Sequence, residues 1–495
     1  MNIKRAKQEI KDAIEAYLKK DAYGEYEIPS IRQRPILLMG PPGIGKTQIM
    51  EQIARECEVG LVAYTITHHT RQSAVGLPFI REREYAGKMY SVTEYTMSEI
   101  LATVYEKIEK TGNQEGILFI DEINCVSETL APTMLQFLQN KTFGNQQVPK
   151  GWIIVAAGNP PEYNKSVREF DVVTLDRMKK IDVEANYEVW KEYAYEAGVH
   201  PAILAYLEIR KEYFYRMETT VDGKAFVTAR GWEDLSQLIS VYEKLDKKID
   251  REVVFQYLQH GTVAKDFANY YELYKKYKED YKVEGILKGQ FSQGTISKLK
   301  FAAFDEKLSV VGLLNGKLSE MFRNCWQADA FVTELFGWLR HMKNGNTINQ
   351  VIADAKGVLE QKKREEKLVK QEEHTLLDVL ARLEAYEMML KEEGIKEPEQ
   401  FDRVREEFAK ENARREELVE QTEQALNYAF EFMEQAFGES QEMVIFVTEL
   451  NVNYFSIWFL QENDCDKYYQ YNKGLLFDEQ QRKILSELDE VEHTF

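Results

Sequence analysis

Cysteine is scarce in this chain, which has only four in 495 residues. Cys57, Cys125, Cys325 and Cys465 lie far apart and form no CxxC pair. A disulfide framework and a zinc knuckle both need closely spaced or paired cysteines, so the sequence indicates neither. The four thiols are predicted to be reduced and buried.

Long apolar runs are also missing. No stretch reaches the roughly 18 apolar residues that a membrane-spanning helix needs. The first twenty residues, MNIKRAKQEIKDAIEAYLKK, form an amphipathic, charged pattern without the apolar segment of a signal peptide. These absences predict a cytoplasmic protein with no membrane insertion.

Positive charge is in deficit, with 64 Lys and Arg against 83 Asp and Glu and a formal charge of −19. General binding to a phosphate backbone needs clustered Lys and Arg, so this balance argues against nucleic acid as the partner. Residues 431–495 hold 14 acidic and 4 basic residues, which makes this region an acidic tail with a net charge of −10. Such a tail is either a solvated face or a docking segment for a basic partner.

The remaining composition, 44% hydrophobic, is that of a globular protein with several cores. Over residues 1–183, short apolar runs alternate with helical patterns, which predicts a parallel sheet covered by helices. Residues 184–284 and 285–495 show helical periodicity, so we expect a helical lid followed by an all-α C-terminal domain. Within the latter, residues 356–438 resemble a helical hairpin of coiled-coil type, with Val369, Leu376, Leu383 and Leu390 spaced seven apart.

One glycine-rich motif stands between a predicted strand and a predicted helix. PILLMGPPGIGKTQIM contains the pattern GxxxxGKT, whose glycines let backbone N–H groups point at a phosphate. In such a loop the lysine reaches the β- and γ-phosphates, and the threonine hydroxyl is a ligand of Mg²⁺. The predicted nucleotide-binding residues are Gly40, Pro41, Pro42, Gly43, Ile44, Gly45, Lys46, Thr47 and Gln48.

Two further apolar strands end in polar residues. In GILFIDEIN the apolar strand leads into Asp121, which can hold Mg²⁺, and Glu122, which can polarise an attacking water. In WIIVAAGNPPE the apolar strand leads into Asn159, which can orient that water or contact the γ-phosphate, although an Asn before two prolines also simply makes a turn. The three segments together predict a phosphate-binding site that holds Mg²⁺ and an attacking water.

With these pieces in order, the chain resembles the AAA+ ATPases, and within them the MoxR family, over about residues 35–245. The resemblance rests on GPPGIGKT, GILFIDEIN, VAAGNPPEYN, TLDRMKK and VTARGWEDLSQLI. It implies a five-stranded parallel P-loop core, with Lys46 and Thr47 as Walker A residues, Asp121 and Glu122 as Walker B residues and Asn159 as sensor 1. The helices after about residue 285 match no module of the family.

Two arginines acquire roles through this resemblance. Arg177 in LDRM looks like the arginine finger, which acts on the nucleotide of a neighbouring subunit, and Arg230 in TARGW looks like sensor 2 on the lid. The pattern departs from the family at two neighbours, because Met178 stands where Phe is usual and Ala229 where Pro is usual. A local reading of Arg177 as a surface group beside Asp176 remains open.

The resemblance also implies an assembly and a partner. MoxR-like ATPases form rings, here expected to be a hexamer, and work with von Willebrand factor A proteins. The DxSxS metal motif of that partner domain is absent from this chain, so such a partner must come in trans. The expected function is ATP-driven remodelling of a protein partner.

Two other functions stay open. A DNA-directed AAA+ motor is an alternative, for which the tyrosines and lysines of YYELYKKYKEDYK offer a stacking surface, although such a stripe more often packs against another helix. A nucleotide-gated scaffold with little turnover is the other alternative. The presence of Glu122, Asn159, Arg177 and Arg230 argues against a scaffold, since a protein that only binds nucleotide needs none of them.

Overall fold

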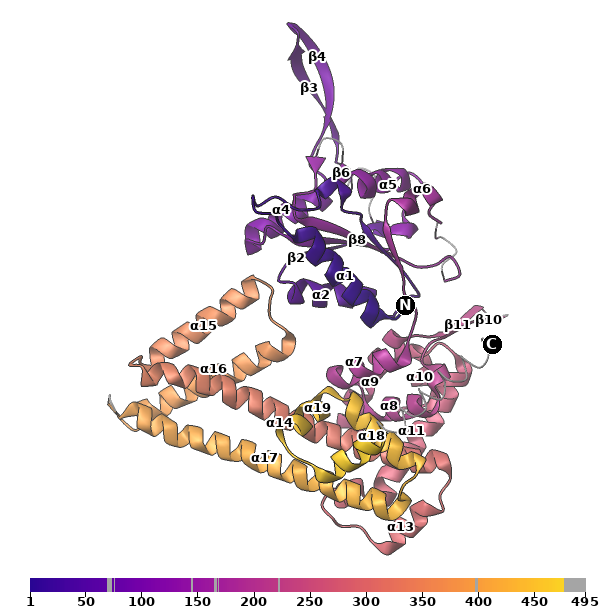
Figure 1. Ribbon diagram of the computed structural model, residues 1–495, viewed down its shortest axis with the longest axis vertical. Coiled ribbons are helices and arrows are strands. Elements are labelled where there is room, and N and C mark those ends of the chain that lie inside the picture. The colour runs from indigo at the N-terminus through magenta and orange to yellow at the C-terminus, as the bar shows by residue number, and fades with distance from the viewer. Residues whose placement is uncertain are drawn as a thin grey trace, which may run out of the picture. The chain divides into compact units, whose positions relative to one another are not determined.

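The computed structural model describes residues 1–68, 74, 76–143, 146–163, 167, 169–220, 223–396 and 399–475. The chain divides into two compact units (Figure 1). The core unit comprises Met1–Val189 and Glu360–Leu368, and the helical unit comprises Trp190–Leu359 and Val369–Phe495. Residues 476–495 of the predicted acidic tail lie outside the described residues. The predicted boundaries after residues 183 and 284 stay predictions.

A five-stranded sheet organises the core unit. Its strand order is β2-β5-β8-β1-β9, and every neighbouring pair is parallel, so the predicted α/β core is confirmed. β8 is buried at every residue, as expected for a central strand covered on both faces. The strands are β1 (Ile36–Met39), β2 (Gly60–Thr65), β5 (Gly116–Asp121), β8 (Trp152–Gly158) and β9 (Lys179–Asp182).

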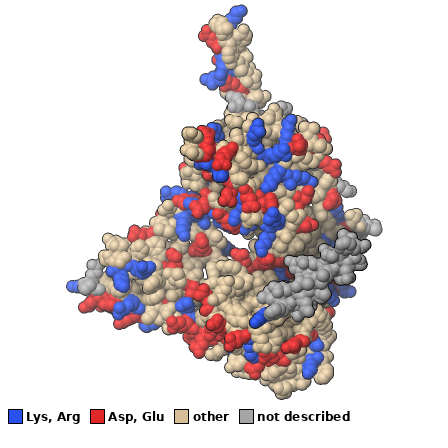
Figure 2. All heavy atoms as spheres, viewed as in Figure 1, with Lys and Arg blue, Asp and Glu red and all other residues tan. Residues whose placement is uncertain are grey.

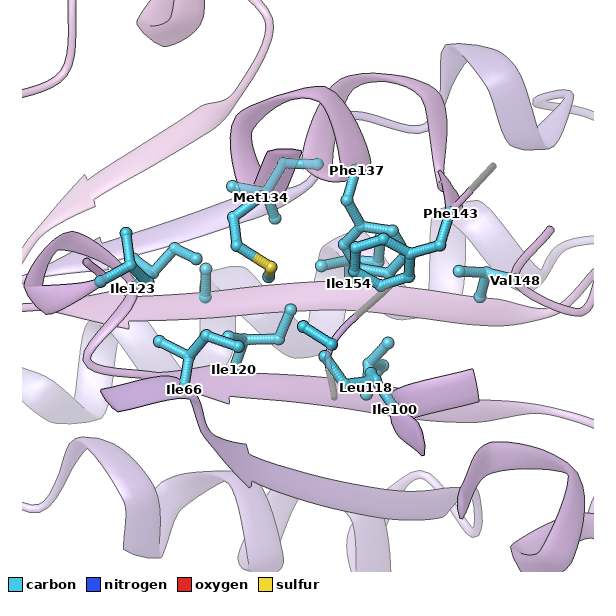
Figure 3. Close-up of a cluster of buried hydrophobic side chains, with 14 of the residues drawn as sticks. Ile66, Ile100, Leu118, Ile120, Ile123, Met134, Phe137, Phe143, Val148 and Ile154 are labelled. Atoms are coloured by element: carbon cyan, nitrogen blue, oxygen red, sulfur yellow. The ribbon is translucent and has the colours of Figure 1, made fainter. Parts of the chain in front are cut away.

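Apolar side chains from strands and helices meet in one buried cluster of this unit (Figure 3). Phe137 of α5 stacks on Phe143 with ring centroids 3.9 Å apart, above Ile154 of β8. Met178 belongs to the same cluster and is 4% exposed, so the residue that departs from the LDRF pattern fills a core position. Burying side chains of this size stabilises the fold by about 1.5–3 kcal/mol each. The helices of the unit are α1 (Ile3–Leu18), α2 (Lys46–Glu56), α4 (Glu99–Thr111), α5 (Ala131–Asn140) and α6 (Val172–Asp176).

A long β-hairpin projects from the core unit (Figure 1). Its antiparallel strands are β3 (Pro78–Tyr85) and β4 (Lys88–Tyr95), and nearly all of their residues are exposed. A second, very short pair is β6 (Thr142–Phe143) and β7 (Gln146–Gln147).

The 40-residue helix α14 (Phe304–Lys343) forms the centre of the helical unit, and α8, α11, α16, α17, α18 and α19 pack along it. Of the tyrosine stripe on α11, Tyr274 and Tyr281 are buried, so this face packs against other helices. The other elements are α7 (Tyr187–Ala197), α8 (Pro201–Ile209), β10 (Arg216–Thr220), β11 (Gly223–Val227), α9 (Ala229–Lys244), α10 (Arg251–Tyr257), α11 (Gly261–Tyr281), α12 (Val283–Ile286), α13 (Gln293–Lys300), α15 (Ile348–Arg364), α16 (Lys370–Glu392), α17 (Gln400–Phe437), α18 (Gln441–Val452) and α19 (Tyr454–Glu462).

The heptad pattern falls mainly on α16. Leu376, Leu383 and Leu390 are buried, whereas Val369 precedes the helix and is exposed. The range predicted as a helical hairpin, residues 356–438, contains the end of α15 together with α16 and α17, and its assignment as a hairpin of coiled-coil type stays a prediction. Among the described residues, no single helix is long and apolar enough to cross a membrane, and one pair bent by 86°, α18 with α19, meets the criteria only jointly.

Candidate functional site

The loop between β1 and α2 is shaped by its glycines. Gly43 and Gly45 have φ of 75° and 89°, in the left-handed region where only glycine carries little strain. A Cβ at Gly40 would lie 2.6 Å from the carbonyl oxygen of Val183, so this position has no room for a side chain. No side chain caps the N-terminus of α2. The first N–H groups of this helix can therefore donate hydrogen bonds to an anion at the loop.

Lys46 is the first residue of α2 and is only 8% exposed. Its Nζ donates hydrogen bonds to the carbonyl oxygens of Gly40 and Pro41, both at 2.8 Å, and to Oδ1 of Asn159 at 2.9 Å. The lysine thus joins the glycine loop to the end of β8, the strand beside β1. The structure therefore brings Lys46 and Asn159 together.

Thr47 and Asp121 meet across the same edge of the sheet. Oγ1 of Thr47 donates to Oδ2 of Asp121 at 2.9 Å. A hydroxyl and a carboxylate are hard oxygen donors of the kind that Mg²⁺ prefers, together with waters and phosphate oxygens. These two residues therefore fit a Mg²⁺ ion beside a bound nucleotide.

Glu122 follows Asp121 in an unusual backbone conformation. Its φ of 56° and ψ of 34° lie in the left-handed region, and its N–H donates to Oδ1 of Asp121 at 2.9 Å. This conformation is costly for a residue with a side chain, and such strain is often found at functional sites. The hydrogen bond ties the backbone of Glu122 to the carboxylate of Asp121.

Asn124 is a site residue that the sequence motifs did not reveal. Its Nδ2 donates to the carbonyl oxygen of Asn159 at 2.8 Å, and its Oδ1 accepts from the N–H of Asn159 at 3.3 Å. The side chain is buried, and a Cβ at Gly158 would lie 2.6 Å from its Oδ1. Asn124 therefore fixes the backbone that presents Asn159. Its only trace in the sequence is a polar residue two positions after the Asp-Glu pair.

Arg177 lies at the opposite edge of the sheet. β9 pairs with β1 in the register Ile36↔Lys179, so Arg177 precedes the strand starts, whereas the glycine loop follows the end of β1 at Met39. Four strand residues span about 13 Å along the strand direction. The Arg177 side chain is exposed, and its Nη1 donates to Oε1 of Gln139. The structure does not bring it to Lys46 or Asp121 of its own chain.

Arg230 belongs to the helical unit, as the second residue of α9. Its side chain is exposed, while its neighbour Ala229 is buried. Thr228 caps the helix by accepting the N–H of Gly231 at 3.2 Å. The alanine that replaces the usual proline thus leaves a well-formed helix start.

The model of the ATPase family associated with various cellular activities (AAA) matches residues 36–177. These residues form an AAA ATPase domain. The AAA domain begins at the first residue of β1, contains the glycine loop, Asp121 and Asn159, and ends at Arg177. The match to this model supports nucleotide binding at the loop described above.

A similar solved structure is that of a candidate ATPase from Cytophaga hutchinsonii, with 16% identity and a TM-score of 0.21. The match covers 37% of this chain and 52% of the other, so the chain spans about half the length of that protein. A search of proteins with curated functions gave no match. The AAA domain is therefore identified by the family model and by its own geometry.

Proposed function

We propose that this protein is a Mg²⁺-dependent, ATP-hydrolysing remodelling ATPase of MoxR type that works as a ring, expected to be a hexamer. The observation that carries the proposal is that the polar residues of the predicted site lie at two opposite edges of the five-stranded sheet. Lys46, Thr47, Asp121 and Asn159 are joined by hydrogen bonds at one edge of the sheet, and Arg177 is exposed at the other.

Each residue of the joined set has a part in this proposal. Lys46 binds the β- and γ-phosphates, and Thr47 with Asp121 holds Mg²⁺, which supplies charge neutralisation when bound. Glu122 accepts a proton from the attacking water, and Asn159 orients that water. Because Lys46 and Asn159 already share a hydrogen bond, both can respond to the same γ-phosphate.

Arg177 supports the ring. An arginine finger stabilises the charge that develops on the transferring phosphate and contributes about 10³–10⁵ in rate in well-studied systems. The opposite edge of the sheet keeps Arg177 from its own nucleotide, so its target in this proposal is the nucleotide of the next copy. Repetition of one such head-to-tail contact gives a ring when the rotation between neighbouring copies closes. Arg230 acts in cis and couples the angle of the helical lid to the nucleotide.

The ring is tested by mixing Arg177→Ala with the wild-type protein. We expect the variant to bind ATP normally, to hydrolyse it about 10³-fold more slowly, and to lower the activity of wild-type subunits more than in proportion to its share. Gln139→Ala is the matched control, since it removes the partner of Arg177 in the isolated chain and keeps the guanidinium. Strictly proportional activity in the mixtures would falsify a role for Arg177 between subunits.

The partner in this proposal is a von Willebrand factor A protein supplied in trans, bound by the helical unit. Glu122→Gln, which binds ATP and cannot hydrolyse it, should retain such a partner in a co-purification with the two purified proteins. A DNA-directed motor is the alternative, and a nucleic-acid-stimulated ATPase rate would favour it. Tyr274 and Tyr281 are buried, so they are not available to stack on bases, which weakens the case for that alternative.

A further inference from the structure

The β3–β4 hairpin has two faces that differ in charge. Residues directly opposite in an antiparallel pair share a face, and successive residues alternate between faces. The register from Pro78↔Tyr95 to Tyr85↔Lys88 therefore sorts all sixteen residues. The basic face carries Phe79, Arg81, Arg83, Tyr85, Lys88, Tyr90, Val92 and Glu94, and the acidic face carries Pro78, Ile80, Glu82, Glu84, Met89, Ser91, Thr93 and Tyr95.

The formal charges of the two faces are equal and opposite. The basic face has three cations and Glu94, a net charge of +2, and the acidic face has Glu82 and Glu84, a net charge of −2. On the basic face, Arg81 and Arg83 lie 3.5 Å and 2.5 Å from the carboxylate of Glu94. Within the described part of the chain, no cation pairs with Glu82 or Glu84. Figure 2 shows both signs of charge along the hairpin.

Both faces also expose large apolar side chains. Ile80 and Met89 of the acidic face are 77% and 61% exposed, and Tyr85 and Tyr90 of the basic face are about half exposed. An isolated two-stranded hairpin is only marginally stable in water. Contiguous exposed apolar groups in a folded protein commonly mark an interaction surface. The hairpin therefore needs a partner surface that is both apolar and charged.

We propose that the basic face of the hairpin packs against the acidic face of the hairpin of a second copy of this chain. Each face offers the charge that the other lacks, so the same molecule supplies the complementary partner. A contact between two different faces is head-to-tail, so it is not the contact of a two-fold dimer and gives a ring when the rotation between copies closes. This inference rests on the proposed function, because the ring is its assembly.

The size of the hairpin limits what this contact can do. Eight residues per strand span about 27 Å, and a two-stranded face is about 10 Å wide, so two stacked hairpins bury roughly 500 Å² in total. A stable interface buries about 1,200–2,000 Å². Stacked hairpins therefore set the order and register of neighbouring copies, and other surfaces of the copies supply most of the buried interface area.

The charges can be exchanged to test the contact. The variant Arg83→Glu with Lys88→Glu changes the basic face from +2 to −2, and Glu82→Lys with Glu84→Lys changes the acidic face from −2 to +2. We expect each double variant alone to need about a tenfold higher protein concentration for assembly with a non-hydrolysable ATP analogue, because like charges then face each other. Sedimentation velocity measures this shift.

Restoration is the decisive result. An equimolar mixture of the two double variants, and a single chain with all four substitutions, should assemble within about twofold of the wild-type concentration, since opposite faces meet again. Ser91→Ala with Thr93→Ala is the matched control, which alters the acidic face without changing its charge and should leave assembly unchanged.

Several outcomes overturn the proposal. Hairpin stacking is excluded if both double variants assemble at the wild-type concentration. It is also excluded if neither the mixture nor the four-substitution chain restores assembly. A single-stranded oligonucleotide that binds wild type and not Arg83→Glu with Lys88→Glu, with assembly unaltered, assigns the basic face to nucleic acid instead. If the wild-type protein itself never assembles with nucleotide, the ring of the proposed function fails, and the stacking inference fails with it.

Discussion

The core unit buries Lys46 and the helical unit buries Lys191, and the two ammonium groups have different partners. Nζ of Lys46 donates to two backbone carbonyls and the amide oxygen of Asn159, which are neutral oxygens. Nζ of Lys191, which is 2% exposed, donates to the carboxylates of Glu208, at 2.7 Å, and Glu449. Burial opposes the charge of Lys191, but the attraction of the two carboxylates outweighs it and raises the lysine pKa.

This difference separates a binding lysine from a structural one. The carboxylates around Lys191 compensate its charge within the helical unit, and Tyr195 donates a further hydrogen bond to Glu449. The oxygens around Lys46 position its ammonium beside a glycine loop whose N–H groups also favour an anion. In the proposed function a nucleotide phosphate supplies negative charge to Lys46, whereas Glu208 and Glu449 supply it to Lys191. The following predictions test this contrast, from the largest expected effect to the smallest.

Replacing Lys46 should affect function and hardly affect folding. In Lys46→Ala we expect ATP hydrolysis to fall by at least about 10³-fold, since a charge that stabilises the transferring phosphate is lost. The free energy of unfolding should change by less than about 1 kcal/mol, because removing the buried ammonium also removes the cost of burying its charge, which offsets the lost hydrogen bonds. Steady-state ATPase assays and urea unfolding measure the two effects. A large loss of stability would show that Lys46 is as structural as Lys191.

Replacing Lys191 should have the opposite effect. Lys191→Met removes the ammonium that Glu449 contacts and leaves Glu208 with Lys211, which lies 3.0 Å from it, and should lower the free energy of unfolding of the helical unit by about 3–5 kcal/mol. ATP binding to the AAA domain should be unchanged at temperatures where the variant is folded. The double variant Lys191→Met with Glu449→Leu is the control, and it should recover part of the lost stability, because one uncompensated charge is then gone.

Replacing Asn124, a neutral side chain of the nucleotide site, should affect both stability and function. Asn124→Ala leaves the N–H and carbonyl of Asn159 without their buried partner, and should cost about 1–3 kcal/mol in stability. We also expect hydrolysis to fall about tenfold while ATP affinity stays within about twofold, because Lys46 is untouched. Thermal unfolding and nucleotide titration measure these outcomes. Unchanged hydrolysis would make Asn124 a purely structural residue.

The smallest effect is expected at Glu243. Its hydrogen bond with His200 lowers the pKa of its carboxyl to about 2, and a hydrogen bond from Tyr271 acts in the same direction, although burial opposes both. A pKa depressed in the folded state stabilises the protein above the unfolded value near 4.5 and loses this effect as pH falls toward 2. Because the side chain is partly exposed, we expect this loss to be about 1 kcal/mol. Urea unfolding at pH 6 and pH 3 measures this loss, and Glu243→Gln should not show it. An equal loss of unfolding free energy in the variant and the wild type would contradict the role given to Glu243.

Sequence patterns predicted the parts of the protein that depend on the local backbone. The glycine loop, the buried strands and the residues that follow them are local features, so the meeting of Lys46, Thr47, Asp121 and Asn159 at one edge follows from a parallel sheet. Asn124, Gln139 and the pair of Lys191 with Glu449 were not predictable in this way. Their partners are distant in sequence, and only the packing of strands and helices brings them together.

The left-handed backbone of Glu122 has a consequence for selection. Glycine adopts φ near 56° with little cost, so Glu122→Gly should leave the turn intact and relieve about 1 kcal/mol of strain or more. The same change deletes the carboxylate beside Asp121. A screen for thermal stability alone would therefore favour glycine here, and a requirement for ATP turnover would favour glutamate. Selection for thermal stability and selection for ATP turnover therefore favour different residues at position 122.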